Sequence, residues 1–306
     1  MKISIVVRHV EFEKVVETVR SLCIAAAYEL PDDVLSALTK AAGKESNPRA
    51  AKTLNQLIEN ARIAAKERIP LCQDTGLAVV FVEQGENVAV RPPRNTRSRS
   101  KASEGFGGGQ QAVIVEAINA GVAAGYEKGY LRKSVVGDPL NKRKNTGSNT
   151  PAVIHYAVVA GDKLKITIMA KGGGCENKSR FRMFNPTAGV SEIIDWVVDV
   201  AREAGANACP PFIVGVGIGG DFEISCLLSK RALLRNLNDK NPDKFYAKFE
   251  KDLLAGINAL GLGPQGLGGD TTALSVCVET APCHIASLPV AVNIECHSHR
   301  HKTAII

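Results

Sequence analysis

The sequence predicts an α/β fold of the irregular α+β kind, in which mixed sheets are surrounded by helices. Helical and strand patterns alternate along the chain, closely spaced strands suggest hairpins, and few segments have the strand–helix–strand order of a regular parallel sheet. With 306 residues, 45% of them hydrophobic, the chain can bury a sizeable core, which excludes a disordered protein. There is no internal repeat, and we expect a single domain over residues 1–306.

The N-terminal part, residues 10–68, is predicted to be helical. Apolar residues recur at helical spacing over 11–28. Pro31 followed by two aspartates is a typical helix start, and a third helix is expected over about 49–67. These helices need no function beyond packing.

The middle of the chain changes to strand patterns. Residues 77–90, LAVVFVEQGENVAV, are apolar and β-branched around a Gly-containing turn and predict a hairpin. Residues 91–101 are basic and of low complexity, and the glycine-rich GFGGGQQ follows shortly after them, which indicates a solvated loop over 91–110. A helix is expected over about 111–127, and 152–170 predicts a second hairpin about a Gly–Asp turn.

The C-terminal half mixes both patterns. Helices are expected over 188–204, 221–236 and 241–260, and strands over 212–218, 272–279 and 288–295.

The net charge of +7 comes mostly from one segment. Residues 91–101, RPPRNTRSRSK, hold five basic residues and no acid; without them 33 basic residues face 31 acidic ones, a charge of +2. The segment could bind nucleic acid, but no aromatic residues are interleaved for base stacking and the remaining chain is nearly neutral. Nucleic-acid binding through this segment is therefore a less favoured alternative.

No apolar run approaches the roughly 20 residues that span a bilayer, so no membrane span is predicted. The N-terminus carries charges where a secretory signal needs an apolar stretch, so we expect a cytoplasmic protein. Eight scattered cysteines are few for this length and predict thiols or metal ligands rather than a disulfide framework.

A glycine pattern invites a dinucleotide-binding interpretation. Gly215, Gly217 and Gly220 form G-x-G-x-x-G between a strand and a helix pattern, with Asp239 about twenty residues on. The second parallel strand that should end at Asp239 is missing, because RALLRNLNDKNPD is polar and helix-like. The alternative is that these glycines let a helix pack closely on a strand.

Several cysteines and histidines are candidates for metal binding. Cys72, Cys209 and Cys296 each lie at the edge of an apolar segment, where a thiolate could face a cleft, although an inert buried thiol is the common alternative. Cys175 competes with them, because three glycines precede it. The remaining thiols, Cys23, Cys226 and Cys277, lie within element patterns and indicate core positions, while Cys283 is undecided. The alternating His297, His299 and His301 would share one face of a strand and could bind metal, although with Arg300 among them a solvated or anion-facing strand is an equal alternative.

Seven segments in order resemble one family over nearly the whole chain. They are IPLCQDTG (69–76), LRKSVVGDPL (131–140), NTGSNTPA (145–152), AKGGGCENKSR (170–180), ACPPFIVGVGIGG (208–220), LGLGPQGLGG (260–269) and the segment from His284 to Cys296. The chain resembles the α-subunit of the two-subunit form of class I, iron–sulfur-dependent fumarate hydratases, with L-tartrate dehydratase α-subunits as close relatives. The resemblance implies the fold of the N-terminal, cluster-binding domain of class I fumarases.

The resemblance implies a 4Fe-4S cluster held by Cys72, Cys209 and Cys296. Three thiolates leave one iron open, and an open metal position can act as a Lewis acid on substrate, whereas four thiolates suit electron transfer. Cys175 stands where single-chain relatives often carry serine, so it is expected to be a neighbour of the cluster and not a ligand.

The resemblance also implies the catalytic and substrate-binding residues of a fumarate hydratase. Asp74 pairs with His284 to move the proton, and this histidine can come from a second copy of the subunit. Gln73, Arg132 and the backbone at Gly174 match substrate-contacting positions, where a guanidinium suits a carboxylate.

The family further implies a small dicarboxylate substrate and a partner. Single-chain members continue into a second domain, so we expect a separate β-subunit, α-subunits that pair in an α2β2 assembly, and little activity without the partner. Fumarate and (S)-malate are expected ahead of tartrate. The basic segment at 91–110 departs from the family as an insertion; a less favoured alternative, an iron–sulfur redox carrier, would not need the carboxylate and arginine residues.

Overall fold

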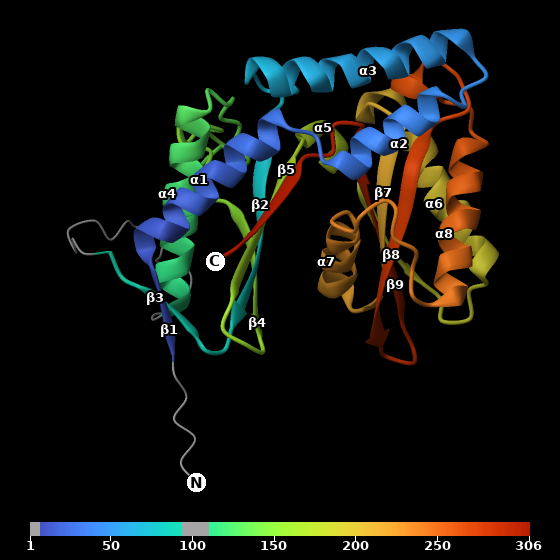
Figure 1. Ribbon diagram of the computed structural model, residues 1–306. Coiled ribbons are helices and arrows are strands. Elements are labelled where there is room, and N and C mark those ends of the chain that lie inside the picture. Colours follow the sequence, from blue (N-terminus) through green and yellow to red (C-terminus); the bar gives the residue numbers. More distant parts are fainter. Residues whose placement is uncertain (1–6, 94–109) are drawn as a thin grey trace. The chain divides into compact units, whose positions relative to one another are not determined.

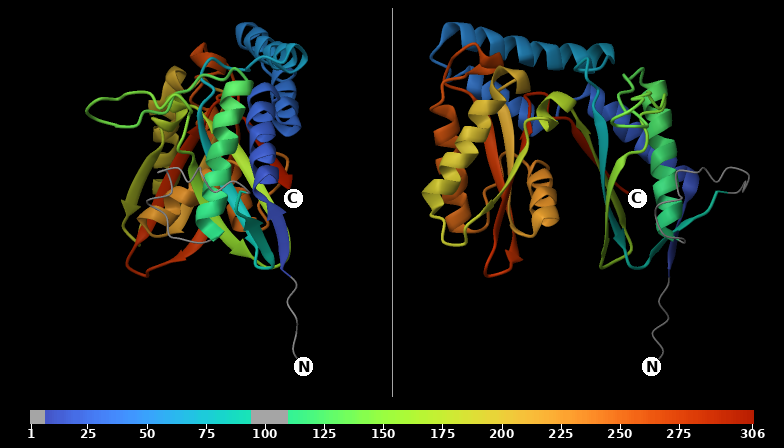
Figure 2. Two further views of the ribbon diagram at one scale, coloured as in Figure 1. Left: turned by 90° about the vertical axis from the view of Figure 1, so that its left-hand side faces the viewer. Right: turned by 180° about the vertical axis from the view of Figure 1, so that it is seen from behind.

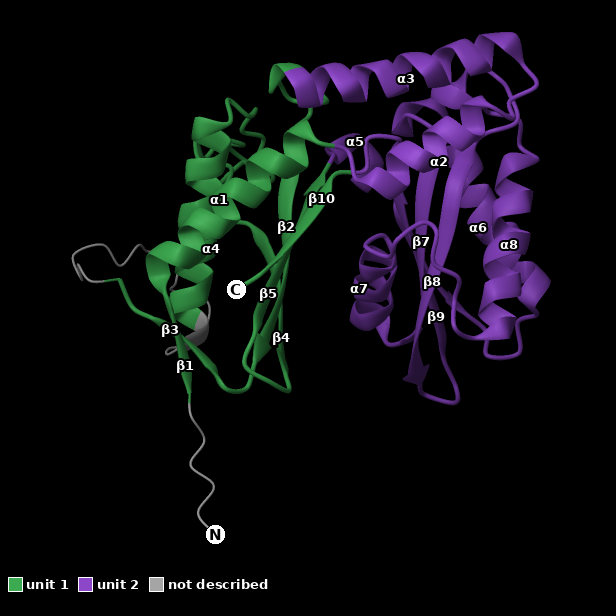
Figure 3. Cartoon of the chain, viewed as in Figure 1, with its two compact units in different colours: residues 1–29, 67–171, 300–306 green, residues 30–66, 172–299 purple. Residues whose placement is uncertain are grey.

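The computed structural model describes residues 7–93 and 110–306, which form two compact units (Figure 3). Unit 1 comprises residues 1–29, 67–171 and 300–306, and unit 2 comprises 30–66 and 172–299. Within the described residues each unit has one four-stranded mixed sheet, and unit 1 has a further two-stranded one. The α/β fold with mixed sheets and surrounding helices is therefore confirmed, while a single domain over the whole chain stays a prediction. Most of the basic insertion, 94–109, lies outside the described residues.

The three N-terminal helices are present as predicted (Figure 1). They are α1 (Phe12–Tyr28), α2 (Asp32–Ala42) and α3 (Pro48–Glu67). Helix α2 begins directly after Pro31, and the aspartates of its first turn complement the positive end of the helix dipole. Helix α1 belongs to unit 1, whereas α2 and almost all of α3 belong to unit 2.

The four-stranded sheet of unit 1 has the order β10-β5-β2-β4. Its strands are β2 (Leu77–Gly85), β4 (Val153–Val159), β5 (Leu164–Lys171) and β10 (His301–Ile305). Strand β2 pairs parallel with β4 and antiparallel with β5, and β10 runs antiparallel to β5. The central strand, β2, is buried along most of its length.

Both predicted hairpins are wrong in their pairing, although their strands exist. Strand β2 lies between β4 and β5, so these two strands do not pair with each other. Both edges of β2 are thereby occupied, and β3 (Val88–Arg91) pairs instead, in parallel, with β1 (Arg8–Glu11). Strand existence follows from local residue patterns, but pairing depends on distant segments that compete for the same edge.

Helices α1 and α4 (Gln110–Lys128) pack closely in unit 1 and lie side by side in Figures 1 and 2. Glycines of α4 permit the approach, because a Cβ on Gly121 would lie 2.6 Å from Val19 Cβ and one on Gly125 would lie 2.8 Å from Cys23 Cβ. Burial raises the pKa of the Cys23 thiol to about 12, which keeps it protonated and inert. The prediction of a core position for Cys23 is confirmed.

The sheet of unit 2 has the order β6-β9-β7-β8. Its strands are β6 (Arg180–Phe184), β7 (Phe212–Gly220), β8 (Ala273–Cys283) and β9 (Leu288–Glu295). Strand β7 pairs parallel with β8 and antiparallel with β9, and β6 runs antiparallel to β9. Three of these strands were predicted, and β6 was missed.

The glycines of β7 admit a helix against the sheet. Helix α7 (Phe222–Ala232) covers one face, while α6 (Val190–Ala204) and α8 (Lys244–Asn258) cover the other (Figure 1). A Cβ on Gly215 would lie 2.0 Å from the carbonyl oxygen of Ser229, and one on Gly217 would lie 2.1 Å from that of Ser225. Val214 and Val216 point instead into the core formed with α6 and α8. The glycine pattern is therefore explained by helix packing.

In the described part of the chain, no helix combines the length and apolar character that crossing a bilayer requires.

Candidate active site

In unit 1, the candidate residues Cys72, Gln73 and Asp74 lie on the loop that leads from α3 into β2. Cys72 and Asp74 are half-buried and Gln73 is exposed. Asp74 Oδ1 accepts a hydrogen bond from Gly76 N at 3.0 Å, a short-range turn typical of aspartate. The Cys72 thiol is 3.3 Å from Gln73 Oε1. The loop therefore presents a thiol, an amide and a carboxylate next to one another at the start of a buried strand.

Buried side chains hold the backbone of this loop. Arg300 is 1% exposed, and its Nη1 donates a hydrogen bond to the Asp74 carbonyl oxygen at 2.7 Å. The Tyr126 hydroxyl donates to the carbonyl oxygens of Thr75 at 2.9 Å and Gly76 at 3.0 Å. Burial raises the pKa of Tyr126, so its hydroxyl stays neutral and can donate. Satisfied buried bonds of this kind keep a loop rigid.

The same bonds bring Arg132 to the loop. Thr75 Oγ1 donates to the Arg132 carbonyl oxygen at 2.7 Å. Asn149, fully buried, accepts from Ser134 N at 2.7 Å and donates to the Gly76 carbonyl oxygen at 3.2 Å. The Arg132 side chain itself is exposed. Unit 1 thus brings the backbone of Arg132 to the loop that carries Cys72, Gln73 and Asp74.

Sequence reasoning missed Arg300 and Asn149 as residues that position the loop. Asn149 lies in NTGSNTPA, a segment that carried the resemblance without a role for this residue. Arg300 lies in HSHRH, which indicated a metal-binding, solvated or anion-facing strand. No signal in the sequence showed that its guanidinium is buried.

In unit 2, Cys209 and Cys296 lie at the same end of the sheet. Cys209 precedes β7 and Cys296 directly follows β9, and these strands are antiparallel, with Ile213 opposite Glu295. His297 N donates to the Cys209 carbonyl oxygen at 3.3 Å. Cys209 is exposed and has left-handed backbone angles, with φ 52° and ψ 65°, whereas Cys296 is buried. Two of the three predicted ligands therefore meet at one edge.

Gly174 and Cys175 come to this edge from the short helix α5 (Gly173–Glu176). A Cβ added to Gly174 would lie 3.6 Å from the Asn207 carbonyl oxygen, two residues before Cys209. The Cys175 thiol is 3.6 Å from the Ala208 carbonyl oxygen. Cys175, predicted to be a neighbour, is thus beside the segments of both Cys209 and Cys296.

His284 lies on the turn between β8 and β9, at the opposite end of the same sheet, where β9 begins beside the end of β7. Strand β7, with nine residues, is about 30 Å long, which is roughly the distance between the two ends. The imidazole is exposed, and its Nδ1 accepts from Ala286 N at 3.1 Å. Unit 2 therefore does not bring its own His284 to Cys209 and Cys296.

The other candidates divide into core and surface positions. Burial raises the pKa values of Cys277 and Cys226, although only Cys277 is fully buried, and Cys283 is exposed. The prediction that His297, His299 and His301 share one strand face is wrong, because only His301 lies in β10. His299 is fully buried, with Nε2 2.7 Å from the Leu233 carbonyl oxygen, because the chain turns there before the strand begins. None of the eight cysteines, every one within the described ranges, forms a disulfide.

The donor set suits an iron–sulfur cluster. Cysteine thiolates are the ligands that such clusters take, and soft sulfur donors disfavour hard ions such as Mg²⁺. Cys72 and Cys209 are accessible, and Cys296 shares its sheet edge with Cys209. The residues predicted as ligands therefore fit the group that the resemblance implies.

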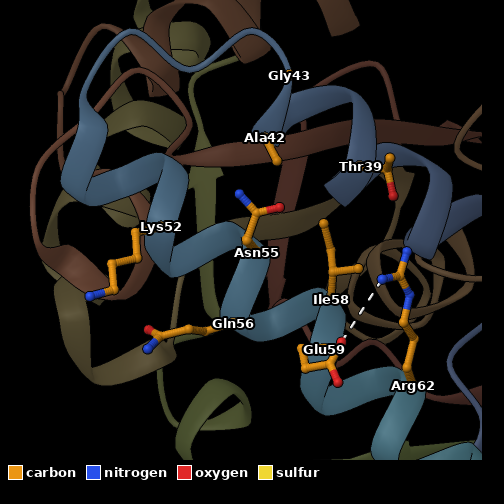
Figure 4. A pocket seen from close by; sticks show the side chains of 9 residues that line it. All are labelled: Thr39, Ala42, Gly43, Lys52, Asn55, Gln56, Ile58, Glu59 and Arg62. Atoms are coloured by element: carbon orange, nitrogen blue, oxygen red, sulfur yellow. Dashed lines mark ion pairs between the residues drawn. The ribbon is translucent and has the colours of Figure 1, made fainter.

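A hollow elsewhere in unit 2 holds none of these residues (Figure 4). It has a volume of about 710 Å³ between α2 and α3, and mostly polar side chains line it. Glu59 and Arg62 form an ion pair of 3.9 Å across its rim, but both side chains are more than half exposed, so the pair contributes little. None of the residues that line this hollow is a candidate site residue, so it is not assigned to the candidate site.

Residues 16–305 match the fumarate hydratase (Fumerase) family. A Methanocaldococcus jannaschii protein provisionally named L(+)-tartrate dehydratase subunit alpha is 40% identical over 291 residues, which cover 94% of this chain and 95% of that protein. Proteins named L(+)-tartrate dehydratase subunit alpha from Escherichia coli O157:H7 and Escherichia coli K12 are 30% identical over 295 residues, 96% of this chain and 91% of each relative.

These similarities support a hydro-lyase. Because the family match covers nearly the whole described chain, the chain belongs to the fumarate hydratase family. The relatives bear the names of alpha subunits.

Proposed function

We propose that the chain is the α-subunit of a 4Fe-4S hydro-lyase that reversibly hydrates fumarate to (S)-malate and that needs a β-subunit for activity. Cys72, Cys209 and Cys296 would hold the cluster. The observation that supports this most is the meeting of Cys209 and Cys296 at one edge of the unit 2 sheet, although they are far apart in the sequence. When bound, the cluster supplies an open iron as a Lewis acid for a substrate carboxylate and hydroxyl.

Hydration adds a proton to one alkene carbon and hydroxide to the other, with no electron transfer. Asp74 and His284 carry the proton in this proposal. Nδ1 of His284 accepts a hydrogen bond, so the neutral imidazole carries its proton on Nε2. The Asp74 loop is fixed by Arg300 and Tyr126, which suits a group that must hold one orientation. Because His284 lies at the far end of its own sheet, it would act in the site of a second copy of the chain.

Substrate binding in this proposal uses Gln73, Arg132 and the backbone at Gly174. The exposed guanidinium of Arg132 can bond a carboxylate in a bidentate way, while its backbone is tied to the Asp74 loop through Thr75. A substrate held by Arg132 would therefore be held relative to Asp74.

L-tartrate is the second candidate substrate. It is favoured by the names of the relatives at 40% and 30% identity, and loss of water from tartrate is the same class of reaction. Both substrates are four-carbon dicarboxylates, so the residues proposed above serve either one.

An assay of the complex tests the proposal. The chain is reconstituted anaerobically with its β-subunit and supplied with fumarate and, separately, with L-tartrate. We expect water addition to fumarate or loss of water from tartrate, and the faster reaction identifies the substrate. Cys209→Ser should abolish the brown cluster absorbance together with the activity. A reconstituted complex that acts on neither substrate would overturn the proposal.

A further inference from the structure

Three side chains with metal-binding atoms meet at the Cys209 and Cys296 edge of unit 2. The sulfur atoms of Cys175 and Cys296 and a carboxylate oxygen of Glu295 all lie within 4.8 Å of one another. All three residues are buried, and Glu295 is completely inaccessible. Of the three, only Cys296 is among the proposed cluster ligands.

Each member of this group is placed by regular structure. Glu295 ends β9 and Cys296 follows it directly, with the Cys296 thiol 3.8 Å from Glu295 Oε1. Cys175 comes from α5, which packs on β9, and its thiol also contacts the Ala208 carbonyl oxygen. Because strand and helix backbones fix these positions, the arrangement exists before any ion binds, which lowers the cost of ordering the ligands.

Two thiols and a carboxylate are a donor set for zinc-class ions. Zinc binds sulfur at about 2.3 Å and carboxylate oxygen at about 2.0–2.2 Å in a tetrahedron, so its ligand atoms lie about 3.5–3.8 Å apart. Atoms already within 4.8 Å of one another need only small side-chain movements to reach that spacing.

We propose that the cluster-free chain binds one zinc-class divalent cation through Cys175, Glu295 and Cys296. The ion would be a substitute occupant that competes with the cluster for the Cys296 thiolate. This competition rests on the proposed function, because it requires Cys296 to be a cluster ligand. The binding of the single ion does not. In the zinc-bound chain the cluster site would be blocked until the ion is removed.

Cobalt is the probe, because Co²⁺ replaces zinc and thiolate ligation gives it a charge-transfer band in the near ultraviolet. The full chain, free of cluster and with its thiols reduced, is titrated anaerobically with Co²⁺. We expect one Co²⁺ per chain, displaced by Zn²⁺. Cys175→Ser and Glu295→Gln should each weaken Co²⁺ binding at least about tenfold. Even the loss of a residue that only hydrogen-bonds to a metal ligand typically lowers metal affinity by about that factor.

Cys72→Ser is the matched control, because Cys72 lies in unit 1 and is a proposed cluster ligand only. It should bind Co²⁺ like the unaltered chain and fail to take up a cluster. Cys175→Ser should bind Co²⁺ weakly and still take up a cluster. Zn²⁺ added before reconstitution should lower cluster uptake in the unaltered chain but not in Cys175→Ser. Circular dichroism of each variant verifies that it is folded.

Unchanged Co²⁺ affinity in both folded variants, Cys175→Ser and Glu295→Gln, would overturn the proposal. So would equal weakening by Cys72→Ser, because the ion would then sit on the cluster thiolates. If no variant and no unaltered chain takes up a cluster but the Co²⁺ results are as expected, the proposed function fails while the single-ion site stands.

Discussion

The sheets of unit 1 and unit 2 have the same strand order and directions. The first strand at one edge, β10 in unit 1 and β6 in unit 2, is antiparallel to its neighbour, β5 or β9. That neighbour is antiparallel to the central strand, β2 or β7. The central strand is parallel to the strand at the other edge, β4 or β8. In both, strands that follow each other in the chain, β4 with β5 and β8 with β9, flank the central strand. The sequence shows no corresponding repeat.

The two units place candidate residues at the same corner of this pattern. Unit 1 presents the Cys72–Asp74 loop before β2, and unit 2 presents Cys209 before β7 and Cys296 after β9. The means of support differ. Unit 1 holds its loop with the buried Arg300, whereas unit 2 brings the backbone segments of Cys209 and Cys296 together by strand pairing. In the proposed function, the same pattern would therefore support two tasks: orientation of a proton-carrying carboxylate in unit 1, and most of the metal ligation in unit 2.

The largest effect should come from the carboxylate of unit 1. Asp74→Asn keeps an oxygen that can accept from Gly76 N but cannot carry the proton, so kcat of the complex should fall about 10²- to 10⁴-fold. Steady-state assays with the better substrate measure this, and cluster absorbance should stay unchanged. An activity within threefold of the unaltered complex would remove Asp74 from the mechanism.

The central strands β2 and β7 differ in whether they tolerate a side chain at every position, and Gly217→Ala in β7 tests this difference. Strand β2 has valines on both faces, but a Cβ at Gly217 would lie 2.1 Å from a backbone oxygen of α7. We expect about 3 kcal/mol lower stability in urea unfolding, because the helix must move away. Gly137→Ala is the control, since its Cβ would have no neighbour nearer than 3.9 Å. Equal stability of the two variants would contradict the close packing of α7.

Much of the fold follows from local sequence patterns, and the rest depends on distant segments. The helices and most strands begin and end within a few residues of their predicted positions, because apolar periodicity and turn residues are local signals. The insertion of β2 between β4 and β5 was not predictable in this way, since strand partners are chosen among segments far apart in the chain.

Part of the candidate site could likewise be predicted from local motifs, and the rest depends on tertiary packing. The motifs around Cys72, Cys209 and Cys296 identified candidate ligands, and the structure places two of them at one sheet edge. Cys175 was expected to be a neighbour of the cluster, and its thiol lies close to that of Cys296. The position of the Glu295 carboxylate beside these two thiols and the burial of Arg300 could not be predicted. Both arise from tertiary packing, and a charged residue in a polar run gives no local sign that it is buried.

Arg300 tests how unit 1 supports its loop. Arg300→Met removes the donor to the Asp74 carbonyl oxygen and should lower stability by about 2 kcal/mol, as for a hydrogen bond to a charged group. It should lower kcat about tenfold through misplacement of Asp74, with KM nearly unchanged. Arg300→Lys should recover part of both effects. A shift in KM alone would show that Arg300 does not act through Asp74.

The smallest effect concerns Glu29, at the end of α1 in unit 1. Burial alone would raise its pKa, but hydrogen bonds and charge from Arg68 and Lys302 outweigh burial and lower it. The folded state therefore gains stability above the unfolded pKa of about 4.3, and loses it as pH falls through the folded value. After solvent screening we expect about 0.5 kcal/mol or less.

Urea unfolding between pH 6 and pH 3 measures this contribution. Glu29→Gln should lose a small part of the acid dependence seen in the unaltered chain, while stability at pH 3 should hardly change. An identical acid dependence in both chains would show that Glu29 gains nothing from its two cationic partners.

In the proposed function, thiolates of Cys72 in unit 1 and of Cys209 and Cys296 in unit 2 would hold one cluster. Iron and acid-labile sulfide are measured in the anaerobically reconstituted chain and in Cys72→Ser, Cys209→Ser and Cys283→Ser, with folding verified by circular dichroism. The account predicts about four iron and four sulfide per chain in the unaltered protein and in Cys283→Ser, and near-background values in the other two. Full iron and sulfide in Cys72→Ser, the variant of unit 1, would contradict it.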